Sequence, residues 1–134
     1  MDTDVIAAAL LGEPETGEEA AQLLAGRWEL FAPAHWKAEL CNVLWKAARA
    51  GRIPQENIEG ILSLAEALPI VSVDVEELWR GAIGRALDTG HPAYDALFVE
   101  LAARLGASVA SYDRQFRDRF PPHVKRPGDL LAGL

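Results

Sequence analysis

A helix–turn–strand unit between His91 and Phe116 constrains the fold more than any other part of the sequence. Pro92 suits the first turn of a helix, and Gly106 marks the turn that follows it. The short apolar run Ser108–Ser111 then has the length and composition of a buried strand. A strand that follows a helix in this way is typical of an α/β protein, in which helices cover a parallel sheet.

The rest of the chain alternates in the same manner. The expected strands are Trp28–Phe31, Ile70–Val73 and a short one near Val124. The expected helices are Val5–Leu11, a helix opened by a capping box at Thr16–Glu19, a long helix over 34–50, one that follows Pro54 and one that follows Asp74. This order predicts an α/β fold with helices on both faces of the sheet, a three-layer α/β/α sandwich.

Length and composition narrow the class of protein further. The chain has 134 residues, so we expect a single domain spanning 1–134. No apolar run reaches the ~18 residues that a membrane helix needs, and the start lacks the basic segment of a signal peptide, so we expect a cytoplasmic protein with no membrane contact. The single Cys41 is consistent with a reducing compartment.

The formal net charge is −7, whereas proteins that bind nucleic acid through its phosphates are normally basic. Contact with a polyanion therefore requires metal ions or a local basic patch. Most of the acidic residues have a simple alternative role as solvated surface.

Four acidic residues lie just after an expected strand, early in a helix or at the amino terminus. Asp113 directly follows the strand Ser108–Ser111, and Asp95 lies in the first turn of its helix. Glu39 lies in the helix that follows the strand Trp28–Phe31, and Asp2 lies at the amino terminus. Ligands of parallel α/β sheets bind beyond the carboxyl ends of the strands, so these four side chains are expected to converge there.

Such a cluster needs neutralisation. Carboxylates ~5 Å apart repel by roughly 3 kcal/mol per pair at an effective dielectric constant of ~20. Protonation and a divalent cation are the two ways to relieve this repulsion. No pair of His and Cys residues has the spacing of a zinc site, so Mg²⁺ or Mn²⁺, which prefer oxygen ligands, are the expected ions.

Four short motifs, in this order, carry a family resemblance that covers essentially the whole chain. They are Asp2-Thr3-Asp4-Val5-Ile6 with 11–15 after it, Pro33 with Glu39, Asn42, Val43 and Leu44, Tyr94-Asp95-Ala96-Leu97, and the run from Ser111 through Asp113 to Phe116. Together they resemble the PIN-domain nucleases, and in particular the toxin subunits of VapBC toxin–antitoxin modules.

The resemblance implies a metal-dependent endoribonuclease that cleaves RNA. It implies an acidic cluster of Asp2, Glu39, Asp95 and Asp113 that holds Mg²⁺ or Mn²⁺, with Asp4 and Ser111 in support. It also implies a parallel sheet of about five strands, a homodimer and an inhibitory antitoxin. Because this chain is acidic, the antitoxin is expected to be basic.

The same resemblance predicts that the first strand is truncated, because only Met1 precedes Asp2. A strand missing from the middle of a sheet leaves backbone groups without partners. The alternative function is therefore a PIN-like domain that has lost catalysis and serves as a binding or scaffold protein.

Each candidate residue also has a simpler structural explanation. Asp113 and Asp4 suit helix N-caps, Asp95 suits the positive end of its helix, and Glu39 is within reach of Lys37 or Lys46 along its helix. Arg114 and Arg117 are candidate contacts for RNA phosphate, with a charged helix face as the alternative. Trp45 and Cys41 form a second apolar helix face that is either more core or, as we favour, a surface for a partner. His35, His91 and His123 are expected to be structural or solvated.

Overall fold

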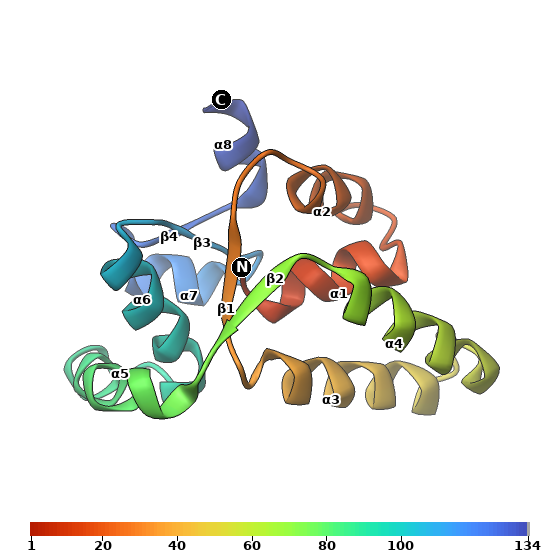
Figure 1. The fold of residues 1–134 in the computed structure, drawn as a ribbon, viewed down its shortest axis with the longest axis horizontal. Coiled ribbons are helices and arrows are strands. Elements are labelled where there is room, and N and C mark those ends of the chain that lie inside the picture. The colour runs from red at the N-terminus through yellow and green to blue at the C-terminus, as the bar shows by residue number, and fades with distance from the viewer. Residues whose placement is uncertain (134) are drawn as a thin grey trace.

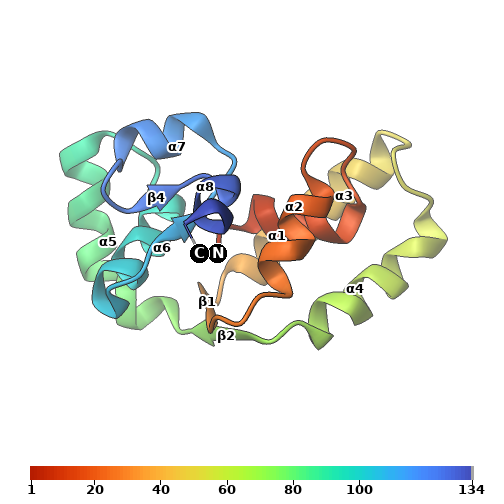
Figure 2. The same cartoon turned by 90° about the horizontal axis from the view of Figure 1, so that it is seen from above.

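The computed structural model describes residues 1–133. Its α-helices are α1 (Thr3–Leu11), α2 (Gly17–Leu24), α3 (Trp36–Arg49), α4 (Ile58–Ala67), α5 (Val75–Thr89), α6 (Ala93–Leu105), α7 (Arg114–Arg119) and α8 (Pro127–Ala132). A 3₁₀ turn, η1 (Gln55–Asn57), precedes α4, and the strands are β1 (Leu30–Pro33), β2 (Ile70–Val73), β3 (Val109–Ala110) and β4 (Val124–Lys125). Figures 1 and 2 show the arrangement from two directions. The α/β class expected from the sequence is therefore correct.

The strands form two separate parallel pairs in the described part of the chain. β1 pairs with β2, with Leu30 opposite Ile70, and β3 pairs with β4, with Val109 opposite Val124. The expectation of one sheet of about five strands is wrong.

The reason for the break is visible at the amino terminus, which lies between the two pairs. The Met1 amino group donates to the Phe31 carbonyl of β1 at 3.1 Å, and the Asp2 N–H donates to the Ala110 carbonyl of β3 at 2.9 Å. Successive residues that bond to opposite sides are typical of a strand in the middle of a sheet. Two residues bridge β1 and β3 here, which is too few to pair the whole length of either strand.

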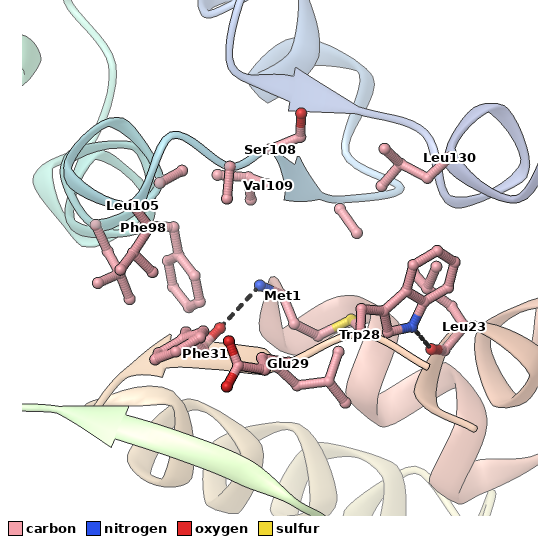
Figure 3. A pocket seen from close by; sticks show the side chains of 15 residues that line it. Met1, Leu23, Trp28, Glu29, Phe31, Phe98, Leu105, Ser108, Val109 and Leu130 are labelled. Carbon is pink, nitrogen blue, oxygen red and sulfur yellow. Dashed lines mark hydrogen bonds between the residues drawn. The ribbon is translucent and has the colours of Figure 1, made fainter. Parts of the chain in front are cut away.

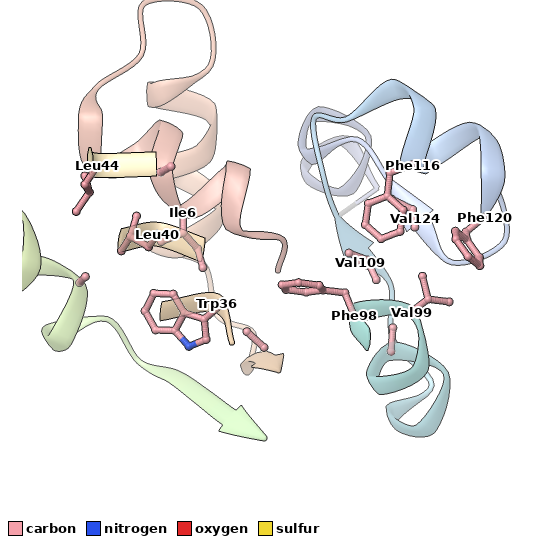
Figure 4. Close-up of a cluster of buried hydrophobic side chains, with 14 residues drawn as sticks. Ile6, Trp36, Leu40, Leu44, Phe98, Val99, Val109, Phe116, Phe120 and Val124 are labelled. Carbon is pink, nitrogen blue, oxygen red and sulfur yellow. The ribbon is translucent and has the colours of Figure 1, made fainter. Parts of the chain in front are cut away.

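Helix α6 fixes the position of β1 and β3 relative to the rest of the chain. It is apolar around most of its surface, and Phe98, Val99 and Ala102 belong to the largest buried cluster, together with Ile6 of α1 and Trp36 of α3. Figure 4 shows Phe98 between the Trp36 side and the Val109 side of this cluster. The helix ends at Gly106, whose φ of 63° is readily adopted only by glycine.

The remaining differences from the expected elements are local. β1 begins two residues later than expected, because the Trp28 indole turns back to donate to the Leu23 carbonyl instead of joining the strand. Thr16 precedes α2 but makes no side-chain cap, and the Pro-rich tail contains α8. No helix within residues 1–133 is both long and apolar enough to span a membrane.

Candidate acidic site

A hydrogen-bond network joins the start of α1 to the end of β3. Ser111 is fully buried, and its hydroxyl lies 2.7 Å from Asp2 Oδ2 and 3.3 Å from Asp4 Oδ2. Asp2 caps α1, because its Oδ1 accepts the Thr3 N–H at 2.7 Å. The Tyr112 N–H donates to Asp4 Oδ2 at 2.9 Å. Two acids from one end of the chain are thus held against the strand that leads to Asp113.

Asp113 begins α7 and faces the same network. Its Oδ1 accepts the Phe116 N–H at 3.1 Å, and its own N–H donates to the Ser111 hydroxyl at 3.1 Å. Asp113 is therefore the N-cap of α7. This role uses only one of its two carboxylate oxygens. The structure supports the capping role and leaves room for a ligand role.

Asp95 lies in the first turn of α6 and is paired with a histidine four residues earlier, before the helix begins. His91 Nε2 lies 2.7 Å from Asp95 Oδ2. The His91 ring is buried, stacked on Phe116 at 5.2 Å between ring centroids and edge-on to Phe120 at 5.7 Å. His91 thereby connects Asp95 to α7, the helix that Asp113 caps.

Glu39 lies in the first turn of α3 and reaches back to α1. Its Oε1 accepts the Thr3 hydroxyl at 2.8 Å and lies 3.5 Å from His35 Nε2. His35 Nε2 also lies 3.1 Å from the Tyr94 carbonyl, next to Asp95 in the chain. The expected alternative, a pair between Glu39 and Lys37 or Lys46, is not among the ion pairs of the described residues.

The pKa shifts of these acids have a common cause. Burial raises the pKa of Asp2 well above its usual range, and the charge of Asp4 and then that of Asp95 raise it further. Burial raises the pKa of Asp4 to about 6, although bonds from Tyr112 and Ser111 oppose the shift, and the charge of Asp113 adds to it. Burial also raises the pKa of Glu39, and Asp95 contributes in the same direction. The five carboxylates are thus electrostatic neighbours.

Two observations test whether a divalent cation fits here. All five side chains offer oxygen atoms, and Asp4 Oδ1 is buried without a hydrogen-bond partner in the described part of the protein. A buried, unpaired carboxylate oxygen is costly unless a cation or a proton reaches it. Against this, residues 1–133 contain no set of three acidic, His or Cys side chains arranged as a ready coordination shell. The oxygen donors are of the kind that Mg²⁺ and Mn²⁺ prefer, but the described residues do not form a preassembled coordination shell.

The two arginines considered for phosphate binding differ in how close they lie to the acidic network. Arg117 Nη1 donates to the Ser111 carbonyl at 3.2 Å, so this side chain lies beside the acidic network. Arg114 is highly exposed and lies 3.8 Å from Asp118 on the outer face of α7. Arg117 is thus the better placed of the two for a ligand in the site.

Sequence reasoning missed three residues of this site. Thr3 and His35 contact Glu39, and His91 contacts Asp95. The spacing was the available signal, because each histidine lies four positions before its acid, just ahead of the helix that carries that acid. His35 Nδ1 is also buried without a partner in the described residues.

One buried acid, three half-buried acids and one exposed acid lie near the ends of two parallel strand pairs, and together with this order of helices and strands they indicate a class of protein. The PIN domain family matches residues 1–119, and the chain belongs to this family. A protein named Ribonuclease VapC3 from Pyrobaculum aerophilum is 31% identical over 128 residues, which are 92% of this chain and 95% of that protein. Proteins of the same name from two strains of Mycobacterium tuberculosis are 29% identical over 102 residues, 76% of this chain and 73% of theirs.

Proposed function

We propose that this protein is a metal-dependent endoribonuclease, the toxin component of a type II toxin–antitoxin module. The observation that carries the proposal is the hydrogen-bond network in which Asp2 and Asp4 both lie against the buried Ser111 hydroxyl, to which the Asp113 N–H also donates. Burial raises the pKa of Asp2 and of Asp4 in this network. A fold that buries several carboxylates side by side loses stability unless something binds them, and clustered perturbed acids are typical of catalytic sites. The names of the similar ribonucleases support the same activity.

In this proposal Asp2, Glu39, Asp95 and Asp113 hold Mg²⁺ or Mn²⁺. When bound, the ion supplies charge neutralisation at the scissile phosphate and makes water a better nucleophile. Ser111 keeps Asp2 turned toward the site through its 2.7 Å hydrogen bond. His91 holds Asp95, and Arg117 offers its positive charge to the RNA backbone.

Glu39 is our candidate to accept the proton of the attacking water. In the metal-free protein burial raises the pKa of Glu39, which makes its carboxylate a stronger base than an exposed glutamate. Its side chain is 31% exposed, which leaves it open to water. Thr3 and His35 fix the orientation of its Oε1 atom.

The partners belong to the same proposal. A net charge of −7 favours a basic antitoxin. Trp45, which is 55% exposed, lies with Cys41 on the outer face of α3 and offers an apolar contact for a second protein. We expect a homodimer in the cytoplasm that co-purifies with a small basic protein encoded beside it.

A matched pair of variants on α7 tests the nuclease activity. Asp113→Asn removes one proposed ligand, whereas Asp118→Asn removes an exposed carboxylate from the same helix. With Mg²⁺ and a panel of end-labelled RNAs, we expect cleavage by the native protein and by Asp118→Asn, and none by Asp113→Asn or after addition of EDTA. Full cleavage by Asp113→Asn contradicts the proposal.

A second candidate, the catalytically impaired scaffold, is favoured by one observation. The described residues lack a ready coordination shell for a metal ion. The two functions differ in their response to Mn²⁺. A working site raises the melting temperature as the ion binds to the folded protein, and an impaired site leaves the melting temperature unchanged.

A further inference from the structure

Helix α6 lines a cavity on one side and a groove on another. The cavity lies between the two strand pairs, and Met1 and Phe98 are among the residues that line it (Figure 3). The groove lies between α5 and the first turns of α6, two helices that pack against each other (Figure 1). It has a volume of about 610 Å³. Ligand sites commonly occupy ~300–1,000 Å³, so the groove is large enough for a small molecule or for one unit of a polymer.

The groove exposes two aromatic rings. Trp79 of α5 is 51% exposed, Tyr94 of α6 is 69% exposed, and both line the groove. The rest of the lining is mostly apolar and includes Ile83, Pro92 and Leu97. Contiguous exposed apolar surface marks sites of interaction in soluble proteins. Flat aromatic faces favour an occupant that is itself a planar ring.

A chain of contacts connects the groove with the candidate acidic site. The Tyr94 ring stacks on the His35 ring, with 6.0 Å between the ring centroids and 29° between the ring planes. His35 Nε2 in turn lies 3.5 Å from Glu39 Oε1. Tyr94 also directly precedes Asp95 in the first turn of α6. An occupant that stacks on Tyr94 is therefore separated from Glu39 by a single ring, that of His35.

The groove also offers one positive charge. Among its lining residues in the described part of the chain, only Arg80 is charged. Arg80 is exposed and takes part in none of the ion pairs within residues 1–133. A guanidinium group binds phosphate with two parallel hydrogen bonds and also stacks on aromatic rings. An aromatic groove with an available arginine therefore matches both parts of a nucleotide, the base and the phosphate.

We propose that this groove is a subsite for an unpaired base of the RNA substrate, close to the phosphate that is cleaved. The identity of the ligand rests on the proposed nuclease function. Trp79 and Tyr94 stack on the base, and Arg80 contacts a neighbouring phosphate. A net charge of −7 disfavours binding through phosphates alone, whereas base stacking needs no positive charge. A second copy of this chain is the competing occupant, and the stack that leads through His35 to Glu39 favours the substrate.

Binding of RNA in the presence of EDTA separates the subsite from catalysis. The anisotropy of a short end-labelled RNA is measured with the RNA single-stranded and annealed to its complement. The native protein should bind the single strand more tightly than the duplex, whose bases are already stacked and paired. Trp79→Leu and Tyr94→Leu should each weaken binding of the single strand by roughly 5–100-fold, the factor expected for loss of one stacked base.

Two further variants serve as controls. Tyr94→Phe keeps the aromatic ring and should bind the single strand as the native protein does. Leu87→Ala removes apolar surface from the same helix as Trp79, at a position that is 78% exposed and outside the groove lining. It should also bind as the native protein does. Because Trp79, Tyr94 and Leu87 are all exposed, the variants should keep the native melting temperature.

Native affinity in both Trp79→Leu and Tyr94→Leu overturns the proposal, as does equal or undetectable binding of single strand and duplex by the native protein. Light scattering on the same variants tests the competing occupant. If Trp79→Leu and Tyr94→Leu change the molecular mass in solution but not the RNA affinity, the groove is an interface between copies and the proposal is wrong. Cleavage with Mg²⁺ is measured separately. Absence of cleavage with intact binding through Tyr94 contradicts the nuclease function and not the subsite.

Discussion

The Ser111 hydroxyl lies 2.7 Å from Asp2 Oδ2, although the two residues are 109 positions apart in the chain. This bond is buried, and it ties the N-cap of α1 to the strand that precedes Asp113. With the bonds from Asp2 N–H to Ala110 and from Tyr112 N–H to Asp4, it joins the two ends of the sequence at the proposed site. A change at Ser111 should therefore affect the acids more than its small side chain suggests.

Replacement of Ser111 by Ala removes that bond and leaves Asp2 buried with one partner fewer. We expect a loss of about 1–3 kcal/mol in the free energy of unfolding, because an unsatisfied buried group costs this much. Chemical denaturation at pH 7 measures it. Ser108→Ala, at an exposed position before β3, is the control and should change stability by less than about 0.5 kcal/mol. Equal losses in both variants contradict the role of Ser111.

The pKa of Asp4 sets a dependence of stability on pH. A carboxyl whose pKa is raised on folding, here from 3.8 to about 6, holds its proton in the folded state over a range where the unfolded chain has lost it. Stability should therefore fall as the pH rises from about 4 to about 6, by at most about 3 kcal/mol from Asp4. Without metal, Asp4→Asn should flatten this slope and Asp118→Asn should retain it. A steeper fall of stability with pH in Asp4→Asn contradicts the raised pKa of Asp4.

His91 should act on the reaction through Asp95. His91→Phe retains an aromatic ring against Phe116 and Phe120 but loses the 2.7 Å contact with Asp95. Loss of such a partner typically costs about 10–100-fold in metal affinity or activity. We expect the Mg²⁺ concentration for half-maximal RNA cleavage to rise, with a melting temperature close to that of the native protein. His91→Gln, which can still donate a hydrogen bond, should lie between the two; native metal dependence in His91→Phe is the contrary result.

Replacement of two different glycines by alanine should change the free energy of unfolding in opposite directions. Gly106 has a φ of 63°, so Gly106→Ala should destabilise the protein by about 1 kcal/mol. Gly60 lies inside α4, where an added Cβ meets nothing within 4 Å, so Gly60→Ala should stabilise by about 0.5–1 kcal/mol. Thermal melts of the two variants measure both effects, and shifts of the same sign contradict the assigned conformations.

Local patterns predicted much of the fold. β2 has the expected bounds, and α6 lies between Pro92 and Gly106, because turn residues and apolar periodicity act within a few positions. The joining of strands into a sheet could not be predicted in this way. It depends on what lies between β1 and β3, and Met1 and Asp2 fill only one end of that space.

For the acidic residues, too, the sequence predicted one part of the arrangement and could not predict another. The rule that ligands bind at the carboxyl ends of strands predicted that Asp95, Asp113 and Glu39 lie near one another. It could not give the hydrogen bonds that orient them, since Thr3, Ser111 and His91 reach the acids only after the chain has folded. The site residues remain predictions until their ligands are measured.

Calorimetric titration of Mn²⁺ at pH 6, in two buffers of different ionisation heat, tests the central claim most directly. If the acidic cluster holds the ion, the native protein binds Mn²⁺ and releases protons, because burial raises the pKa of Asp2 well above its usual range and ligands must be ionised. Asp2→Asn should lose most of this binding, and Asp118→Asn should retain it. Absence of binding to the native protein at millimolar Mn²⁺, or equal binding to Asp2→Asn, contradicts the account.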